Sequence, residues 1–148
     1  MKKEFGIDKY LFYFKEFIKK NQKVINKYLK EYNITYGHLE YIKLLKMNDA
    51  GYTMTELSKH ACIDKSFTTR IIRDLEKKSY VYRDTDNPNS RNYNIRLTEK
   101  GKDMTSNIEA AMKKRKAFFM SEFTEEEKEQ LISTLEMLMR KLEKEESE

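Results

Sequence analysis

Apolar residues recur at the three- and four-residue spacing of an amphipathic helix over most of the chain. Residues 10–32 carry such a stripe, with lysines on the opposite face, and are predicted to form one long helix. Thr35 is a suitable N-cap for a second helix, which should end near Met47 because Asn48 and Gly51 follow. Four glycines and one proline in 148 residues leave few tight turns, so long helices should dominate the fold.

Two shorter helices are predicted next. Thr53 and Glu56 form a capping-box pattern that opens a helix through Ala61. Asp64 can cap another helix that runs to about Lys78. Two helices separated by about three residues are typical of a helix-turn-helix.

A small β-ribbon is predicted after this pair. Residues 80–83 have the composition of a strand, and residues 93–97 alternate apolar and polar side chains at period two. The intervening residues 86–92 are rich in turn formers and too numerous for a tight hairpin, so they should project as a loop. Helix, helix, strand, loop and strand in this order form a winged helix.

The remaining third is predicted to be helical again. Thr98 is a candidate cap for one helix, and Thr124 with Glu127 forms a second capping box before a helix that carries leucines at helical spacing. The predicted fold class is therefore mainly α with a small β-wing, in one domain over residues 1–148. Residues 36–100, approximately, form the winged helix-turn-helix, and about 1–35 and 101–148 are flanking helices.

Charge and composition narrow the function. The net charge of +5 is divided as +5 over residues 1–63, +4 over 64–102 and −4 over 103–148, so the basic excess avoids the C-terminal third. That distribution suits a polyanionic partner, although lysine-rich surfaces also serve solubility. No membrane span or leader pattern is recognised, and the single cysteine, Cys62, fits a reducing compartment, so we expect a cytoplasmic protein. With no glycine-rich phosphate loop and no nucleophile motif, neither an enzyme nor a cofactor is expected.

The helix predicted from Asp64 to Lys78 has two distinct faces. On a helical wheel Phe67, Ile71 and Leu75 cluster on one side, and polar or basic side chains lie opposite. This division suits a recognition helix, which must lock into a core while hydroxyls and arginines meet base edges and phosphates. On an arbitrary helix the same pattern would be a solvated face. The candidate DNA-binding residues are Lys65, Ser66, Thr68, Thr69, Arg70 and Arg73, with Arg91 in the loop for an adjacent minor groove.

Four segments in this order resemble one known family. They are Met54-Thr55-Glu56-Leu57-Ser58, Asp64-Lys65-Ser66-Phe67-Thr68-Thr69-Arg70, Leu75-Glu76-Lys77-Lys78 and Ile95-Arg96-Leu97-Thr98-Glu99-Lys100-Gly101. Together they resemble the multiple-antibiotic-resistance regulator (MarR) family of winged helix-turn-helix transcription regulators, over essentially the whole chain. The resemblance implies a homodimer, joined through its terminal helices, that binds a near-palindromic duplex and represses transcription where that duplex overlaps a promoter.

Two positions depart from the family pattern. Ser79 stands after the recognition helix, where the family usually has glycine, so either a left-handed serine carries strain of roughly 1 kcal/mol or the turn has another shape. The family's Asp-x-Arg wing motif is Asn89-Ser90-Arg91 here, which keeps the arginine and loses its acidic partner.

Other candidate sites carry less weight. His38, His60 and Cys62 lack the spacing of a metal site, and Cys62 is interpreted as structural, in a small apolar site at the turn. The resemblance also implies release from DNA by a small aromatic ligand, and the candidate lining residues are Tyr13, Phe17, Tyr28, His38 and Tyr41. The same aromatic residues could instead be plain core. The rival functional hypothesis is a winged-helix module that binds protein or RNA.

Overall fold

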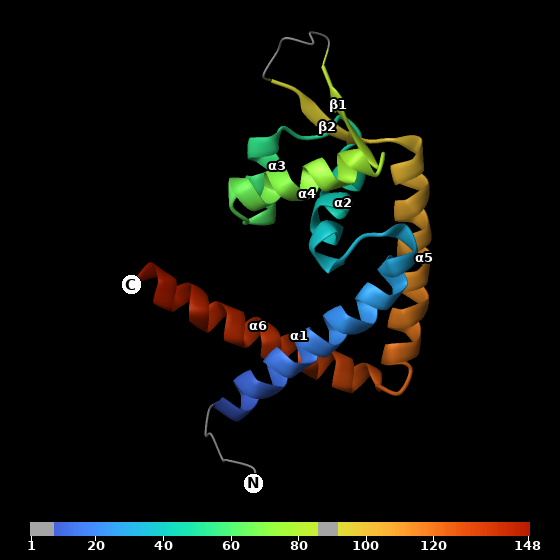
Figure 1. Ribbon diagram of the computed structural model, residues 1–148. Helices are drawn as coiled ribbons and strands as arrows, with labels where there is room; N and C mark the ends of the chain where they lie inside the picture. The colour runs from blue at the N-terminus through green and yellow to red at the C-terminus, as the bar shows by residue number, and fades with distance from the viewer. Residues whose placement is uncertain (1–7, 86–91) are drawn as a thin grey trace. The chain divides into compact units, whose positions relative to one another are not determined.

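The computed structural model describes residues 8–85 and 92–148. Its helices are α1 (Asp8–Leu29), α2 (Tyr36–Met47), α3 (Met54–Ala61), α4 (Lys65–Lys77), α5 (Glu99–Met120) and α6 (Glu125–Ser147), with a short 3₁₀ turn at Lys30–Tyr32. Two strands, β1 (Val81–Asp84) and β2 (Asn94–Leu97), lie between α4 and α5 (Figure 1). The mainly helical class with a small β-wing is confirmed. The chain divides into two compact units, Met1–Ala111 and Met112–Glu148.

The predicted caps are present. Thr53 and Glu56 exchange both capping-box hydrogen bonds at the start of α3. The Asp64 carboxylate accepts from the Phe67 amide at 2.8 Å, and α4 begins at the next residue. Each cap accepts from a first-turn backbone amide that has no acceptor within the helix. The first residues of α3 and α4 are therefore determined by their neighbours in the chain.

The wing is a two-stranded antiparallel ribbon. Val81 pairs with Leu97 and Asp84 with Asn94, so β1 begins one residue later than the sequence predicts. Tyr52 adds a bridge to Ile95, which joins the segment before α3 to the ribbon. Gly51 makes this approach possible, because it has a positive φ of 77° and a Cβ there would lie 2.2 Å from the Ile95 carbonyl oxygen.

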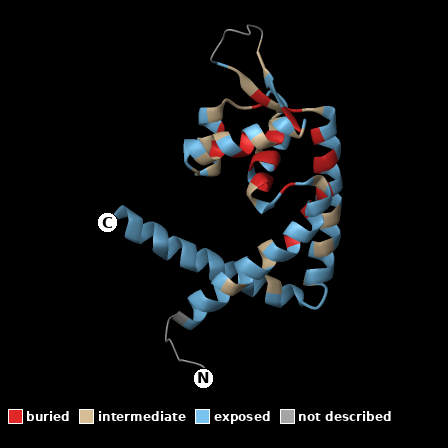
Figure 2. Ribbon diagram, in the orientation of Figure 1, coloured by how far each residue is buried: buried red, intermediate tan, exposed pale blue. Residues whose placement is uncertain are grey.

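Buried residues gather in the first unit. Figure 2 shows them concentrated in α2, α3, α4, the ribbon and the beginning of α5. Leu57 of α3, Ile72 and Leu75 of α4, and Ile95 of β2 are fully buried, together with Tyr41 of α2. The core therefore lies on the inner side of the helix-turn-helix and holds α4 in place.

Three helical segments end in the same way without glycine. Asn33, Cys62 and Ser79 have φ of 56°, 53° and 63°. At Ser79, the Ser79 amide donates to Glu76 and the Tyr80 amide to Leu75, which is the Schellman arrangement. Of the two turns considered for Ser79, the left-handed one is therefore confirmed.

The second unit contains the end of α5 and all of α6. The Thr124 hydroxyl accepts from the Glu127 amide at 3.1 Å, and the Glu127 carboxylate accepts from the Thr124 amide at 2.9 Å, so the predicted capping box is confirmed. No residue of α6 is buried. Its apolar side chains are exposed despite their helical spacing.

Candidate nucleic-acid interface

The outer face of α4 carries a row of polar and basic side chains. Ser66, Arg70 and Arg73 are exposed, and their spacing of four and three residues places them on one side of the helix. Lys65 is exposed in the first turn, and Lys77 continues the row in the last. The sequence prediction did not include Lys77, although the same spacing indicates it.

The inner face of α4 is apolar with one polar exception. Ile71, Ile72 and Leu75 are buried, as the helical wheel predicts. Thr68 is also fully buried, with its hydroxyl 2.9 Å from the Tyr41 hydroxyl and 3.0 Å from the Asp64 carbonyl oxygen. The structure therefore does not bring Thr68 to the outer face with the other candidate DNA-binding residues.

Two further candidates are partly engaged within α4 itself. Thr69 is half-buried, and its hydroxyl donates to the Lys65 carbonyl oxygen at 2.8 Å. The Arg70 guanidinium lies 4.8 Å from the centre of the Phe67 ring, which holds the arginine along the helix surface. Arg91, together with Asn89 and Ser90, lies outside the described residues.

A concavity lies between the start of α3, the outer face of α4 and the ribbon. We call it the α4–wing concavity, and it is lined by Thr53, Met54, Thr55, Lys65, Thr69, Arg73, Arg83, Asn92 and Tyr93. It brings the predicted Lys65, Thr69 and Arg73 together with Arg83, which the sequence prediction missed. Arg83 lies six residues after the end of α4, and its approach to α4 depends on the turn between α4 and β1.

Two arginines of the ribbon have different surroundings. The Arg83 Nε lies 3.0 Å from a Glu76 carboxylate oxygen, and its guanidinium lies 4.7 Å from the Tyr93 ring centre. Arg96 donates from Nε to the Asp49 carbonyl oxygen at 2.7 Å and from Nη1 to Asp84 at 2.8 Å. The hydrogen bond with Asp84 raises the pKa of Arg96. Arg96 thus ties the ribbon to the turn before α3, whereas Arg83 lines the concavity.

A buried histidine connects α2 to α4. His38 Nδ1 accepts from the Thr35 amide at 3.0 Å, and Nε2 lies 2.7 Å from Asp74 Oδ2. Asp74 also accepts from Lys78. The hydrogen bond from Lys78, with that from His38, lowers the pKa of Asp74 below its ordinary value despite partial burial.

The candidate effector residues fall into two groups. Tyr13, Phe17 and Tyr28 are exposed on α1, with 58%, 52% and 43% of their surface accessible. His38 and Tyr41 are buried, and their polar atoms are hydrogen-bonded to Asp74 and Thr68. The structure therefore brings the last two into the core beneath α4.

The environment of Cys62 differs from the small apolar site that the sequence predicts. Its side chain is exposed, and its thiol lies 3.6 Å from the Lys59 carbonyl oxygen. The left-handed backbone of Cys62 ends α3 and turns its side chain outward, so no small apolar site surrounds it. Within residues 8–85 and 92–148, no group of three or more histidines, cysteines or acidic residues is arranged to hold a metal ion. None of the helices described there combines the length and apolar composition of a membrane span.

Comparisons with known proteins agree with this architecture. The MarR family model matches residues 34–93. The HTH-type transcriptional regulator SarZ of Staphylococcus epidermidis is 33% identical over 135 residues, which cover 89% of this chain and 86% of the relative. A MarR transcriptional regulator from Methanosarcina mazei has a TM-score of 0.71 at 28% identity, covering 93% of this chain and 96% of that one.

A more distant structural neighbour was solved with nucleic acid. The S. aureus MepR–DNA complex has a TM-score of 0.79 at 22% identity, covering 90% of this chain and 97% of that one. At that identity the likeness concerns the fold. The extent of the SarZ match, and its agreement with the helix-turn-helix and wing described above, show that this chain belongs to the MarR family.

Proposed function

We propose that the protein is a transcription regulator that binds double-stranded DNA sequence-specifically, as a homodimer, and represses promoters that its operator overlaps. The observation that carries this proposal is the outer face of α4, where Ser66, Arg70 and Arg73 form an exposed row on a helix whose opposite face is buried. A helix whose opposite face is packed against the core can enter a major groove without losing that packing.

The relatives also support DNA binding and transcription regulation. SarZ is named as an HTH-type transcriptional regulator, and MepR was solved in complex with DNA. Arginine pairs well with guanine edges and hydroxyls with several bases, so the α4 row suits base reading. Repression is the regulatory outcome expected of a protein that occupies promoter DNA.

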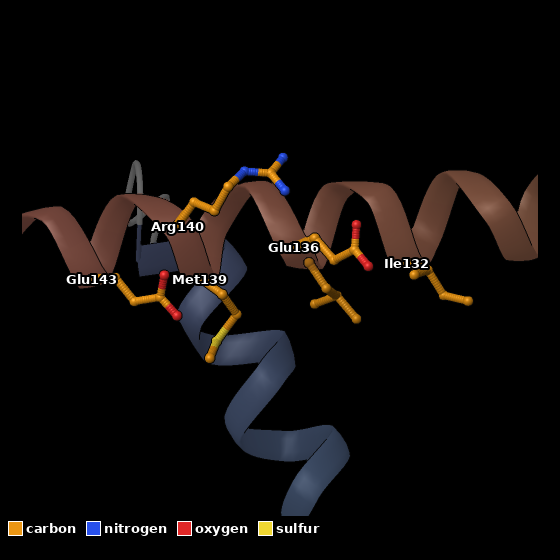
Figure 3. Close-up of a pocket in the computed structure, with 6 residues that line it drawn as sticks. Ile132, Glu136, Met139, Arg140 and Glu143 are labelled. Atoms are coloured by element: carbon orange, nitrogen blue, oxygen red, sulfur yellow. The ribbon is translucent and has the colours of Figure 1, made fainter.

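The terminal helices support the homodimer. Figure 3 shows Ile132, Glu136 and Met139 projecting from the same side of α6. Ile132, Leu135 and Met139 follow one another at three- and four-residue spacing and are 56%, 38% and 58% exposed. An apolar stripe of this kind costs free energy in water until a partner covers it. A two-fold partner would also present two α4 helices, which predicts a near-palindromic operator with half-sites about one helical turn apart.

Selection from random duplexes tests DNA recognition directly. The protein should enrich a two-fold motif, and Arg73→Ala should change that motif or cost about 1–3 kcal/mol of binding free energy. Lys43→Ala is a matched control, because Lys43 is exposed on α2 and does not line the α4–wing concavity. Failure to enrich any two-fold motif, or preferential binding of RNA at matched salt, would overturn the proposal. Either result would favour the alternative, a winged-helix module that binds protein or RNA.

Sedimentation tests the dimer. Ile132→Glu combined with Met139→Glu places two charges on the apolar stripe of α6 and should convert the dimer to a folded monomer with much weaker operator binding. Gln130→Glu with Ser133→Glu is the control pair, because it places two charges at exposed positions of the same helix that lie outside this stripe. A double glutamate variant that still sediments as a dimer would place the interface elsewhere.

We also propose release by a small aromatic acid, with Tyr13, Phe17 and Tyr28 as the accessible part of its site. Their exposed rings on α1 support this, whereas His38 and Tyr41 are buried and their polar atoms already have partners on α4. A ligand releases DNA only if it prefers the non-binding form of the protein. A thermal-shift screen of phenolic acids followed by DNA titration tests this: stabilising compounds that leave DNA affinity unchanged would contradict it.

A further inference from the structure

The α4–wing concavity has the composition of an anion site. Lys65, Arg73 and Arg83 contribute three positive charges from α4 and β1, and none of the described residues that line it is acidic. The remaining lining side chains are uncharged. Two of the threonine hydroxyls already donate within the protein, from Thr53 to Glu56 and from Thr69 to the Lys65 carbonyl oxygen, so the three basic side chains are the main donors. Several basic side chains that line one hollow suit a phosphate or another oxyanion.

Arg83 is held in a fixed orientation at this hollow. Its Nε faces the Glu76 carboxylate of α4 at 3.0 Å, and the Tyr93 ring supports its guanidinium at 4.7 Å. Both contacts restrain the same planar group, so less side-chain entropy remains to be lost on binding. With Nε engaged by Glu76, the two Nη groups are the part of the guanidinium that can donate to an anion.

The position of the hollow indicates which anion. If α4 lies in a major groove and the wing reaches the adjacent minor groove, one sugar-phosphate backbone must pass between them, because that backbone separates the two grooves. The α4–wing concavity lies between these two elements, with β1 directly after α4 in the chain (Figure 1). In that arrangement Arg83 would face the backbone, whereas Ser66 and Arg70, which do not line the concavity, would face the bases.

We propose that the α4–wing concavity seats one backbone phosphate of the operator, with Arg83 as its principal ligand and Glu76 and Tyr93 as positioning residues. The proposal rests on DNA binding by α4. It goes beyond that function by assigning to Arg83 a contact that adds affinity for any duplex and no sequence preference. Backbone contacts determine where a protein lies on the duplex, and base contacts determine which sequence it prefers.

Salt dependence of binding by Arg83→Gln tests the assignment. The variant should bind the selected operator and an unrelated duplex more weakly by the same factor, about tenfold at low salt. Its slope of log affinity against log salt should be smaller by about 0.9, the value for one phosphate contact. Lys43→Gln removes a charge outside the concavity and should leave the slope unchanged. Arg83→Lys retains the charge and should retain most of the slope.

Methylphosphonate substitution locates the phosphate. Neutral linkages placed one at a time along each half-site should weaken the wild-type protein at one position between the α4 and wing contacts, and Arg83→Gln should be insensitive there. Thermal midpoints of all variants check folding. A loss confined to the selected operator, or an unchanged salt slope, would overturn the phosphate assignment while wild-type DNA binding stands. Absence of any duplex binding by the wild-type protein would instead overturn the function on which it rests.

Discussion

Helices α4 and α6 have the same kind of N-cap, but the apolar face of α4 is buried and that of α6 is exposed. Asp64 and Thr124 each cap their helix by accepting from an amide three residues on, and both helices carry apolar residues at helical spacing. The 13 residues of α4 include a fully buried Ile72 and Leu75, whereas the 23 residues of α6 include no buried side chain (Figure 2). Local signals thus determine that a helix forms, and the available partner determines whether its apolar face contributes to stability.

Matched leucine truncations should show the largest difference. Leu75→Ala should lower the free energy of unfolding by about 2–5 kcal/mol, because Leu75 is fully buried and its loss leaves a cavity. Leu138→Ala, at a side chain that is 42% exposed, should change the monomer by no more than about 0.5 kcal/mol and act mainly on association. Urea denaturation at two protein concentrations separates these effects. Equal losses at low concentration would show that α6 is covered within its own chain.

The buried hydroxyl pair beneath α4 should give the next largest effect. Thr68 donates to the Asp64 carbonyl oxygen, which leaves the Tyr41 hydroxyl to donate to Thr68. Thr68→Val removes both bonds and should cost about 1–3 kcal/mol, and Tyr41→Phe should cost about 1 kcal/mol. The double variant should cost less than the two changes added, because they share one hydrogen bond. Strict additivity in a thermodynamic cycle would contradict this pairing.

Local features of the sequence were enough to predict the helices and their caps. Thr53, Asp64 and Thr124 each accept from an amide three residues away, so their roles follow from neighbours in the chain. Thr98 is a further case, since its hydroxyl accepts from the Gly101 amide at 3.0 Å and α5 starts at Glu99.

Contacts between distant elements were not predictable in this way. The Thr68 hydroxyl meets a tyrosine 27 residues away, and Asp74 meets a histidine 36 residues away. Both contacts depend on how far α4 is rotated about its own axis relative to α2. The spacing of apolar residues along α4 does not determine that rotation to within one residue. That rotation is the reason that Thr68 lies inward, and the turn after Ser79 is the reason that Arg83 reaches the α4–wing concavity.

The C-terminal end of α4 offers a smaller test of how closely the sequence suits its structure. Ser79→Gly should raise the free energy of unfolding by about 1 kcal/mol, because glycine adopts a φ of 63° without the penalty of a Cβ. Asn33→Gly should gain less, since asparagine tolerates the left-handed region better than serine. Thermal and urea unfolding measure both changes. A loss of stability in Ser79→Gly would mean that the serine side chain makes a contact that outweighs its strain.

Asp74, at the margin of the α4 inner face, should give the smallest effect, and one that depends on pH. Hydrogen bonds from Lys78 and His38 lower the pKa of Asp74 below its ordinary value of 3.8. Between the folded and unfolded pKa values the unfolded state binds more protons, so the stabilisation is fully present above the unfolded value and is lost as pH falls through the folded one. Denaturation midpoints measured from about pH 6 down to about pH 2 should therefore fall more steeply for the wild-type protein than for Asp74→Asn.

The control for this pH effect is Asp103→Asn. Asp103 is exposed on α5, and removing its charge changes the net charge by the same amount as Asp74→Asn. Its pH profile should follow that of the wild-type protein, because the effect expected at Asp74 comes from two specific donors and not from total charge. If both variants flattened the profile equally, the acid loss would reflect general repulsion among cations. The contact between α2 and α4 would then contribute nothing measurable to how α4 is held, and its inner face would depend on apolar burial and the Tyr41–Thr68 pair.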